Sequence, residues 1–321
     1  MKRARARSDQ EFARSTEPFL SEIRLHCYRM LGSVHDADDA VQETLLRAWR
    51  HERDLRDASA RRAWLYRIAT NVCLRAVSRQ QPLPAGGDPT VEFPPPNAAG
   101  AVTAPPTPYP DSLIDTVADD PSGRYELRES VELAFLAAVQ LLPPRQRAVL
   151  LLRDVLGWRA AEVASMLDSS VASVNSALQR ARATLDERRR SGDLAPAAGL
   201  TSAAVERELV GRFMRAWEGV DIDGLVALLR EDALLTMPPT PLGYRGPAAI
   251  REFFATVPSG GRLDRIRLVE TRANSQPALA AYEDGGAYGL MVLGIAGAAI
   301  ASVTGYADPT LFPLFGLPAR I

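Results

Sequence analysis

The sequence predicts a multidomain protein, with two all-α domains followed by one α+β domain. Apolar residues recur at helical spacing over about 11–80 and again over about 124–190. Between these stretches, residues 81–123 are dense in Pro, Gly and Ala, which excludes a continuous helix and predicts an extended linker. From residue 203 onward, helical patterns give way to short apolar runs bounded by Gly, Asp and Pro. That order is typical of helices covering a mostly antiparallel sheet.

The composition is that of a folded protein. The chain has 321 residues, 46% of them hydrophobic, and a net charge of −1, so it has room for two or three domains with their own cores. Cys27 and Cys73 lie on apolar helix faces. We therefore expect buried thiols in a reducing cytosol, without a disulfide, a metal site or a cofactor.

Neither a signal peptide nor a membrane partner is expected. The N-terminus is basic, but no apolar stretch follows it. Residues 288–303 form the most apolar run. Their Gly and β-branched residues predict buried strands rather than a membrane-spanning helix, which needs about 18 or more apolar residues.

Three helices are expected in the first domain, residues 11–80. Gly32 and the Ser after it end the first helix. Asp36 is the expected N-cap of the second helix, whose first turn is rich in acids that suit the helix dipole. The third helix is expected over 60–80, and the spacing of Trp64 to later apolar residues predicts that it faces the core.

The second domain, residues 124–190, is also expected to be helical. An amphipathic helix is predicted over 125–142, and the next helix begins after a Pro pair, as the first turn of a helix allows. Two helical segments, 159–167 and 171–188, are joined by Asp-Ser-Ser. Such a pair is typical of a helix-turn-helix, in which the second helix enters the major groove of DNA.

The last of these helices has one apolar face and one polar face without acids. Its predicted inward residues are Val174, Leu178, Ala181 and Leu185, and its predicted outward residues are Asn175, Ser176, Gln179 and Arg180. Asn and Gln can bind adenine edges, and Arg can bind guanine or phosphate. A solvated amphipathic helix explains the same segment. Taken alone, the segment leaves the two explanations about even, and the absence of acids favours DNA.

The third domain, residues 203–321, follows a second linker at 191–202. Two helices are expected over 201–232, then a short strand at 233–239 and a helix at 246–258. Four further strands are expected over residues 264–273, 278–285, 287–295 and 297–306.

Two segments resemble the sigma-70 family of the extracytoplasmic-function (ECF) type. "LPPRQRAVLLLRDVLGWRAAEVASMLDSSVASVNSALQRARATL" (142–185) resembles sigma region 4. "MLGSVHDADDAVQETLLRAWR" and "AWLYRIATNVCLRAVSR" resemble the two parts of region 2. The resemblance covers about residues 11–190. It implies a sigma factor that binds RNA polymerase core, recognises −35 and −10 promoter elements and initiates transcription without catalytic residues of its own.

The resemblance also implies roles for particular residues. The set matching the surface that binds the clamp helices of the largest polymerase subunit is Asp38, Asp39, Gln42, Glu43 and Leu46. The set matching the helix that holds melted −10 DNA is Arg61, Arg62, Arg67, Asn71 and Arg75. The set matching the −35 recognition helix is Asn175, Ser176, Gln179, Arg180 and Arg182, the last expected on phosphate.

Residues 203–321 resemble the SnoaL-like, cone-shaped α+β fold. Three segments are similar to contact motifs of actinobacterial ECF sigma factors that carry such a domain, which implies that it touches and modulates the sigma domains. The residues concerned are Tyr109, Pro110, Asp111, Asp284, Gly285, Gly286, Asp308, Leu311 and Phe312. A small apolar ligand in the cavity of this domain is a further expected partner.

The main alternative is a helix-turn-helix module fused to a small-molecule-binding or isomerase- or cyclase-like enzyme domain. Such chemistry needs a placed acid or base, and the C-terminal domain has no histidine. Asp232 and Glu283 are the candidate acids, and Tyr244 is a candidate pocket residue. We expect Asp232 to face solvent, which favours a regulatory domain over an enzyme.

Overall fold

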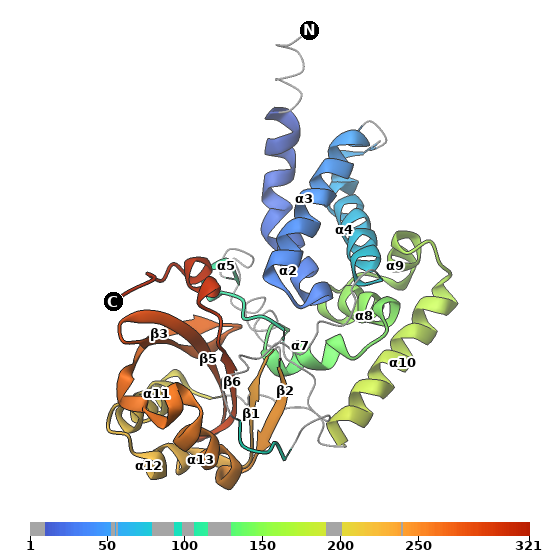
Figure 1. Ribbon diagram of the computed structural model, residues 1–321. Helices are drawn as coiled ribbons and strands as arrows, with labels where there is room; N and C mark the ends of the chain where they lie inside the picture. Colours follow the sequence, from blue (N-terminus) through green and yellow to red (C-terminus); the bar gives the residue numbers. More distant parts are fainter. Residues whose placement is uncertain are drawn as a thin grey trace. The chain divides into compact units, whose positions relative to one another are not determined.

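The computed structural model describes residues 10–52, 55, 57–78, 93–97, 106–114, 130–190, 201–238 and 240–321. Contacts between residues divide the chain into two units. Among the described elements, the first unit contains the helices before residue 81 and those from 142 to 186, and the second contains the C-terminal domain with parts of the linker (Figure 1).

Three helices form the first part of the first unit. They are α2 (Leu20–Leu31), α3 (Val34–Arg50) and α4 (Arg61–Val77), with short 3-10 turns at Glu17–Phe19 and Ala58–Ala60. Each helix packs against the other two. This confirms the expected helical bundle.

The cap of α3 differs from the prediction. Ser33, not Asp36, is the N-cap, and its hydroxyl accepts a hydrogen bond from the Asp36 backbone N–H at 3.2 Å. The reason is the preceding residue: Gly32 ends α2 with φ of 74°, and Ser33 follows in an extended conformation that directs its hydroxyl to the first turn.

The buried face of α4 also differs from the prediction. Trp64 is only half-buried, whereas Tyr66 is completely buried. The Tyr66 hydroxyl donates to Glu22 at 3.2 Å, and its ring packs edge-on against His26 with centroids 5.2 Å apart. A tyrosine can be buried at this place because a partner satisfies its hydroxyl.

The second part of the first unit contains the predicted helix-turn-helix. Helix α8 (Pro144–Leu150) runs into a π-helical turn at Leu151–Val155, and α9 (Ala160–Met166) and α10 (Val171–Arg190) follow. Ser170 caps α10 by accepting from the Ser173 N–H at 3.1 Å. Val174, Leu178 and Ala181 are buried as predicted, and Leu185 is half-buried.

The second unit is built on a six-stranded sheet in the order β2-β1-β6-β5-β4-β3. The strands are β1 (Leu229–Met237), β2 (Thr240–Arg245), β3 (Ile266–Ala273), β4 (Gln276–Glu283), β5 (Gly286–Ala296) and β6 (Ala299–Tyr306). Strands β1 and β6 are parallel, and the other neighbours are antiparallel. Strand β2, which contains Pro241 and Gly243, was not predicted from the sequence. An edge strand tolerates such residues because one of its sides needs no ladder bonds.

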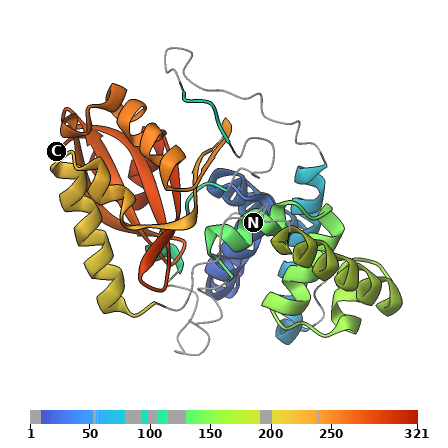
Figure 2. The same cartoon turned by 90° about the horizontal axis from the view of Figure 1, so that it is seen from below.

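The sheet has a different core on each face. Helices α11 (Ala203–Glu218), α12 (Ile222–Val226) and α13 (Pro247–Thr256) cover one face (Figure 2). Phe213, Trp217 and Phe254 pack there with ring centroids about 6 Å apart. On the other face, Phe312 of the turn η7 (Pro309–Phe315) packs edge-on against Tyr282 at 5.1 Å. This arrangement confirms the expected α+β domain.

Described residues of the linker, 93–97 and 106–112, belong to the second unit, and so do residues 130–141 after it. Residues 106–110 are extended, and a short helix, α5 (Asp111–Ile114), follows them. Of the helix predicted over 125–142, the structure describes α7 (Leu133–Gln140), and residues 115–129 lie outside the described residues. Within the described chain, no helix is both long and apolar enough to cross a membrane.

Candidate functional site

Helix α10 presents the residues predicted to face DNA on one exposed surface. Asn175, Ser176, Gln179 and Arg180 are all exposed, one or two turns from the capped start of the helix. The Arg180 guanidinium donates to the Ser176 hydroxyl at 2.6 Å. The surface therefore offers amide, hydroxyl and guanidinium groups, which can bond base edges in the major groove.

Arg182 lies beside this surface and is held by an acid. Its Nε and Nη2 donate to the two carboxylate oxygens of Asp154 at 2.9 and 2.8 Å. These hydrogen bonds raise the pKa of Arg182 above its ordinary value. The side chain is 60% exposed, so a phosphate can reach it, in competition with Asp154.

Helix α3 carries an exposed stripe that combines polar and apolar side chains. Asp39, Gln42, Leu46 and Trp49 lie three or four residues apart and are all exposed. Leu46 is 49% exposed and Trp49 is 39% exposed. The other two predicted core-binding residues are tied down nearby, Asp38 to Arg24 at 2.8 Å and Glu43 to Arg47 at 2.6 Å. Exposed apolar groups among acids are typical of a protein-binding surface.

Helix α4 holds the residues predicted to grip −10 DNA, and most of them already have partners. Arg62 makes a two-pronged contact with Glu22, with Nε to Oε1 at 3.0 Å and Nη2 to Oε2 at 2.7 Å. Arg61 pairs with Glu52 at 3.4 Å. Arg75 is exposed and lines a groove between α3 and α4 that also contains Asp39.

Three of these α4 residues also contact the helix-turn-helix part of the same unit. The Arg62 guanidinium carbon lies 5.0 Å from the ring centroid of Trp158. Arg67 forms an ion pair with Asp168 at 2.9 Å, and the Asn71 amide donates to the Met166 carbonyl at 3.4 Å.

A buried arginine, which the sequence analysis did not single out, supports this contact. Arg147 on α8 donates to the Met30 carbonyl at the end of α2 at 2.5 Å and to the Leu142 carbonyl at 3.3 Å. Burial lowers the pKa of Arg147 to about 10. The guanidinium stays charged at neutral pH, and carbonyl oxygens compensate for the loss of water.

In the second unit, the hairpin between β3 and β4 binds the linker. The backbone N–H of Tyr109 donates to the side chain of Asn274 at 2.7 Å, and the Asn274 N–H donates to the Tyr109 carbonyl at 2.8 Å. Asp111 accepts from the Ser275 N–H at 2.7 Å and pairs with Arg272 at 3.1 Å. Pro110 adds an isolated antiparallel bridge to β3.

The same surface also binds the chain at Pro106 and at the residues around the start of α7. The Tyr306 hydroxyl at the end of β6 donates to the Pro106 carbonyl at 2.6 Å. The Asn274 amide donates to the Val131 carbonyl at 2.8 Å, just before α7, and the Leu133 N–H donates to Gln276 at 3.2 Å. One hairpin thus binds residues on both sides of the undescribed segment 115–129.

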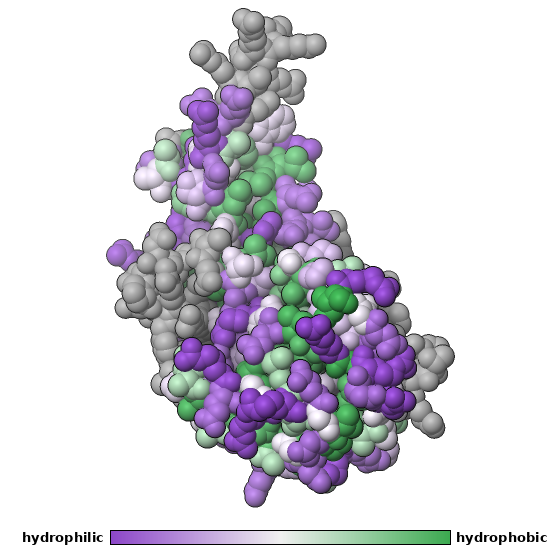
Figure 3. All heavy atoms as spheres, turned by 90° about the vertical axis from the view of Figure 1, so that its left-hand side faces the viewer, coloured by the Kyte–Doolittle hydropathy of each residue, from purple (hydrophilic) through white to green (hydrophobic). Residues whose placement is uncertain are grey.

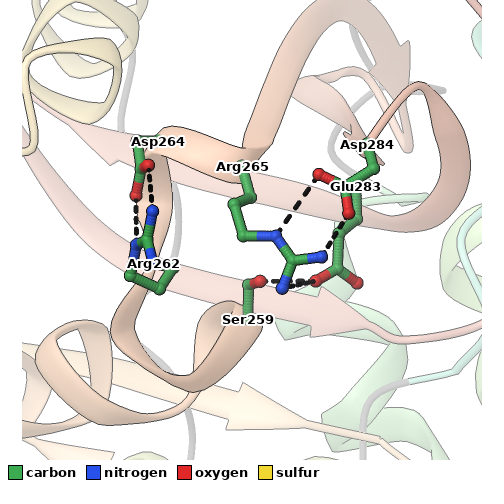
Figure 4. A network of polar contacts seen from close by, with 6 residues as sticks. All are labelled: Ser259, Arg262, Asp264, Arg265, Glu283 and Asp284. Atoms are coloured by element: carbon green, nitrogen blue, oxygen red, sulfur yellow. Dashed lines mark hydrogen bonds and ion pairs between the residues drawn. The ribbon is translucent and has the colours of Figure 1, made fainter.

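The β4–β5 turn at Asp284, Gly285 and Gly286 contacts the C-terminal tail. The Ile321 N–H donates to the Gly285 carbonyl at 2.9 Å, and Gly286 forms a bridge with Arg320. Figure 4 shows Arg265 reaching Asp284 and Glu283, with the Ser259 hydroxyl directed at Glu283.

The remaining predicted contact residues lie in η7. Asp308 caps this turn by accepting from the Thr310 N–H at 2.9 Å. Leu311 and Phe312 are buried on the outer face of the sheet. Polar and charged side chains cover most of the molecular face in Figure 3, with smaller apolar areas between them.

The helix-covered face of the sheet contains an apolar pocket of about 50 Å³. Trp217, Phe254 and Met291 line it, together with the strand residues Gly289 and Gly305. Among the described residues that line it there is neither a carboxylate nor an imidazole.

The candidate catalytic residues are not brought together. Asp232 is exposed and pairs with Arg230 at 2.8 Å, as its expected solvent position allows. The Tyr244 hydroxyl donates to the Pro94 carbonyl at 3.0 Å, and Glu283 accepts from Ser259. None of the three candidates Asp232, Tyr244 and Glu283 is among the described residues that line the cavity, where isomerase chemistry would need a placed acid or base.

Sequence reasoning missed Asn274, Tyr306 and Trp158. For Asn274 a signal existed: Asn-Ser between two strand patterns is a turn in which both residues have positive φ, here 57° and 60°. For Tyr306 and Trp158 no local signal existed, because their partners Pro106 and Arg62 lie 200 and 96 residues away in the chain.

Comparison with known proteins agrees with this architecture. The family model for sigma-70 region 2 matches residues 17–82, that for sigma-70 region 4 matches 132–185, and that for the SnoaL-like domain matches 210–289. The ECF RNA polymerase sigma factor SigG of Mycobacterium tuberculosis is 43% identical over 319 residues, which cover 96% of this chain and 84% of SigG.

Two further relatives show how the similarity is distributed. SigW of Bacillus subtilis, also an ECF sigma factor, is 29% identical over 181 residues, or 56% of this chain and 89% of SigW. The crystal structure of the ECF sigma factor SigJ of Mycobacterium tuberculosis has the same fold, with a TM-score of 0.64 at 23% identity, over 96% of this chain and 99% of that one.

Proposed function

This chain belongs to the ECF sigma factors of the sigma-70 family. We propose that three of its helices each bind a different part of the transcription initiation complex. Helix α3 binds the clamp helices of polymerase core, α4 holds the melted −10 strand, and α10 binds the −35 element. The observation that carries this proposal is the exposed face of α10, where Asn175, Gln179 and Arg180 lie opposite the buried residues Val174, Leu178 and Ala181.

The mechanism is one of binding, without covalent chemistry. The stripe of Leu46 and Trp49 on α3 supplies apolar contact to the core enzyme, and neighbouring acids supply charge complementarity with a basic partner. Helix α10 then positions the duplex. Arginines on α4 bind phosphates and stack on unpaired bases, so that trapping those bases favours the melted state.

The C-terminal domain modulates these steps through the linker. Asn274 supports this part of the proposal, because it bonds Tyr109 on one side of the undescribed segment and Val131 on the other. Region 4 begins at this point according to the family match. Any change in the hairpin therefore changes how freely α7 and the linker can move.

A small apolar ligand in the cavity is a candidate signal for this domain. Two observations support it: the lining is apolar, and Tyr306, whose hydroxyl bonds the linker at Pro106, is one of the lining residues. Titration with naphthalene while the thermal unfolding midpoint is followed tests this idea. Wild type should be stabilised and Ala281→Leu, which fills the cavity, should not. Equal midpoints with and without naphthalene would argue against it.

The test of modulation is run-off transcription by the reconstituted holoenzyme. Asn274→Ala and Asp111→Asn should change transcript yield several-fold in the same direction, since both weaken linker binding. Yields equal to wild type would remove the regulatory role. The enzyme alternative predicts instead that Tyr244→Phe and Asp232→Asn abolish a turnover activity while leaving transcription intact.

A further inference from the structure

The −10 face of α4 is occupied by the chain's own helix-turn-helix part. The occupying groups are the indole of Trp158, the carboxylate of Asp168 and the carbonyl of Met166. All three groups contact α4 residues that bind single-stranded DNA in the proposed function. The inference therefore rests on that function.

The chain around Trp158 is built to hold it in place. The π-helical turn Leu151–Val155 ends in a bend at Gly157, whose φ is 69°. The backbone N–H of Trp158 then donates to the Leu152 carbonyl at 2.9 Å, and the Arg153 guanidinium donates to the Trp158 backbone carbonyl at 2.5 Å. Single π-helical turns are rare and occur frequently at functional sites.

The indole lies where two flat groups meet. The Arg62 guanidinium is 5.0 Å from the Trp158 centroid and 5.2 Å from the Tyr66 centroid, and the two rings meet edge-on at 5.7 Å. Glu22 holds the guanidinium in this position. An arginine fixed against an aromatic ring is a stacking platform for any flat π system, including a nucleobase.

Asp168 completes the likeness to a nucleotide. Its carboxylate gives Arg67 the anionic oxygens that a DNA phosphate would give, and the Met166 carbonyl accepts from Asn71 as a base carbonyl would. Asp168 has φ of 47°, a conformation that aspartate tolerates better than most residues. The loop thus offers an aromatic ring, an anion and a carbonyl to one face of α4.

The contact is not fully satisfied. Among the described residues, the buried Nε1 of Trp158 has no hydrogen-bond acceptor, and a buried donor left without an acceptor destabilises the contact. A DNA base at the same place has a π face and carries hydrogen-bond acceptors, and it would not bring a buried N–H without a partner. The Arg67–Asp168 pair is exposed, with Asp168 side chain exposure of 74%, so a phosphate can replace it readily.

We propose that the surface formed by Arg62, Tyr66, Arg67 and Asn71 is a binding site for one unstacked base and its phosphate, and that Trp158 and Asp168 occupy it as a nucleotide mimic. DNA binding and this internal contact then exclude each other. The chain binds single-stranded DNA weakly until the loop moves away.

The test measures binding of a fluorescein-labelled, random-sequence single-stranded DNA 10-mer to the full-length chain by fluorescence anisotropy. Trp158→Ala removes the indole and should tighten binding about 3- to 10-fold, the range of a lost cation–π contact. Asp168→Asn keeps the backbone conformation and removes the anion, and it should tighten binding about 2-fold. Trp158→Phe keeps a flat ring and should resemble wild type.

Two matched variants complete the experiment. Val220→Ala trims an exposed apolar side chain in the C-terminal domain, outside the surfaces assigned to DNA and core, and should leave DNA binding unchanged. Arg62→Ala should weaken binding in every background and should cancel the gain from Trp158→Ala. Thermal unfolding of each variant establishes that it is folded, and Asp168→Asn carries the test if Trp158→Ala does not fold.

The outcomes separate this inference from the proposed function. If Arg62→Ala weakens binding but neither Trp158→Ala nor Asp168→Asn tightens it, the mimic is wrong and the −10 role of α4 stands. If Arg62→Ala has no effect in any background, the −10 role itself is contradicted and the mimic with it.

Discussion

Asn274 is a single side chain that joins three segments of the chain. It is completely buried, sits in a turn at φ of 57°, and bonds Tyr109 and Val131 while its own N–H bonds Tyr109. The sequence predicted that Tyr109 and Asp111 make contacts with the C-terminal domain but did not predict what they bind. The pairing spans 165 residues, and no local pattern encodes a contact of that range.

Asn274→Ala should release the linker. The change removes two side-chain hydrogen bonds and puts alanine at positive φ, a loss of about 1–3 kcal/mol in docking free energy. Trypsin cleavage after Arg124 or Arg128, both between the two docked ends, should accelerate. Asn175→Ala, an exposed asparagine on α10, is the control. Equal cleavage rates in the two variants would show that Asn274 does not hold the linker.

His26 should make the first unit sensitive to acid. It is completely buried and bonds the Thr70 hydroxyl at 2.9 Å. Burial, together with Arg29, lowers the pKa of His26 to about 3. Below pH 6.5 the His26 imidazole binds a proton in the unfolded chain but not in the folded chain. The free energy of unfolding is therefore unaffected by His26 above pH 6.5, and it falls by about 1.4 kcal/mol per pH unit between pH 6.5 and 3.

Denaturant unfolding at pH 7.5 and 5.5 measures this effect. His26→Gln should unfold with a smaller difference between the two pH values than wild type, whereas His35→Gln, an exposed control, should retain the wild-type difference. The same difference in His26→Gln as in wild type would assign the acid sensitivity to other groups.

Individual helices and strands were predictable to different degrees. The faces of helix α10 were predictable, because its apolar residues follow a helical period that the sequence displays. The buried face of α4 was not, because Tyr66 depends on Glu22, 44 residues away, to satisfy its hydroxyl. Strand β2 was not predicted because a proline in a sequence argues against a strand, although an edge strand tolerates it.

Substitutions on helix α10 should affect sequence specificity and overall DNA affinity separately. Asn175→Ala or Gln179→Ala should weaken binding to the preferred −35 duplex by about 1–3 kcal/mol and affect other sequences less. Arg182→Ala should weaken all sequences alike, and by less than a free arginine would, since Asp154 already holds it. Electrophoretic mobility shifts with specific and scrambled duplexes measure this. Equal losses on both duplexes for Asn175→Ala would contradict its role on base edges.

Helix α3 should bind core polymerase through its exposed stripe. Leu46→Asp places a charge at the centre of this apolar contact and should reduce affinity for the core at least about 10-fold, as expected for a central interface residue. Val220→Asp, which changes an exposed valine in the C-terminal domain, is the control. Titration of core with labelled chain measures the affinity. Wild-type affinity for Leu46→Asp would remove α3 from the interface.

The three folded parts could be predicted from the sequence because each has its own periodicity and linkers separate them. How the linker is held could not be predicted, since that depends on tertiary contacts such as the Tyr306–Pro106 hydrogen bond. The same is true of the loop at Trp158, which covers residues that the sequence assigns to DNA. In this protein, therefore, the binding surfaces are encoded locally and their control is encoded in long-range contacts.

The most direct measurement of the central claim is transcription by a reconstituted complex. The full chain is mixed with bacterial core RNA polymerase, separated by gel filtration, and assayed for run-off transcripts on a pool of genomic promoter fragments. The chain should co-elute with core and produce discrete transcripts, and the Asn175→Ala Gln179→Ala double variant should co-elute but lose those transcripts. A wild-type chain that fails to co-elute with core, or a double variant that retains every transcript, would contradict the account.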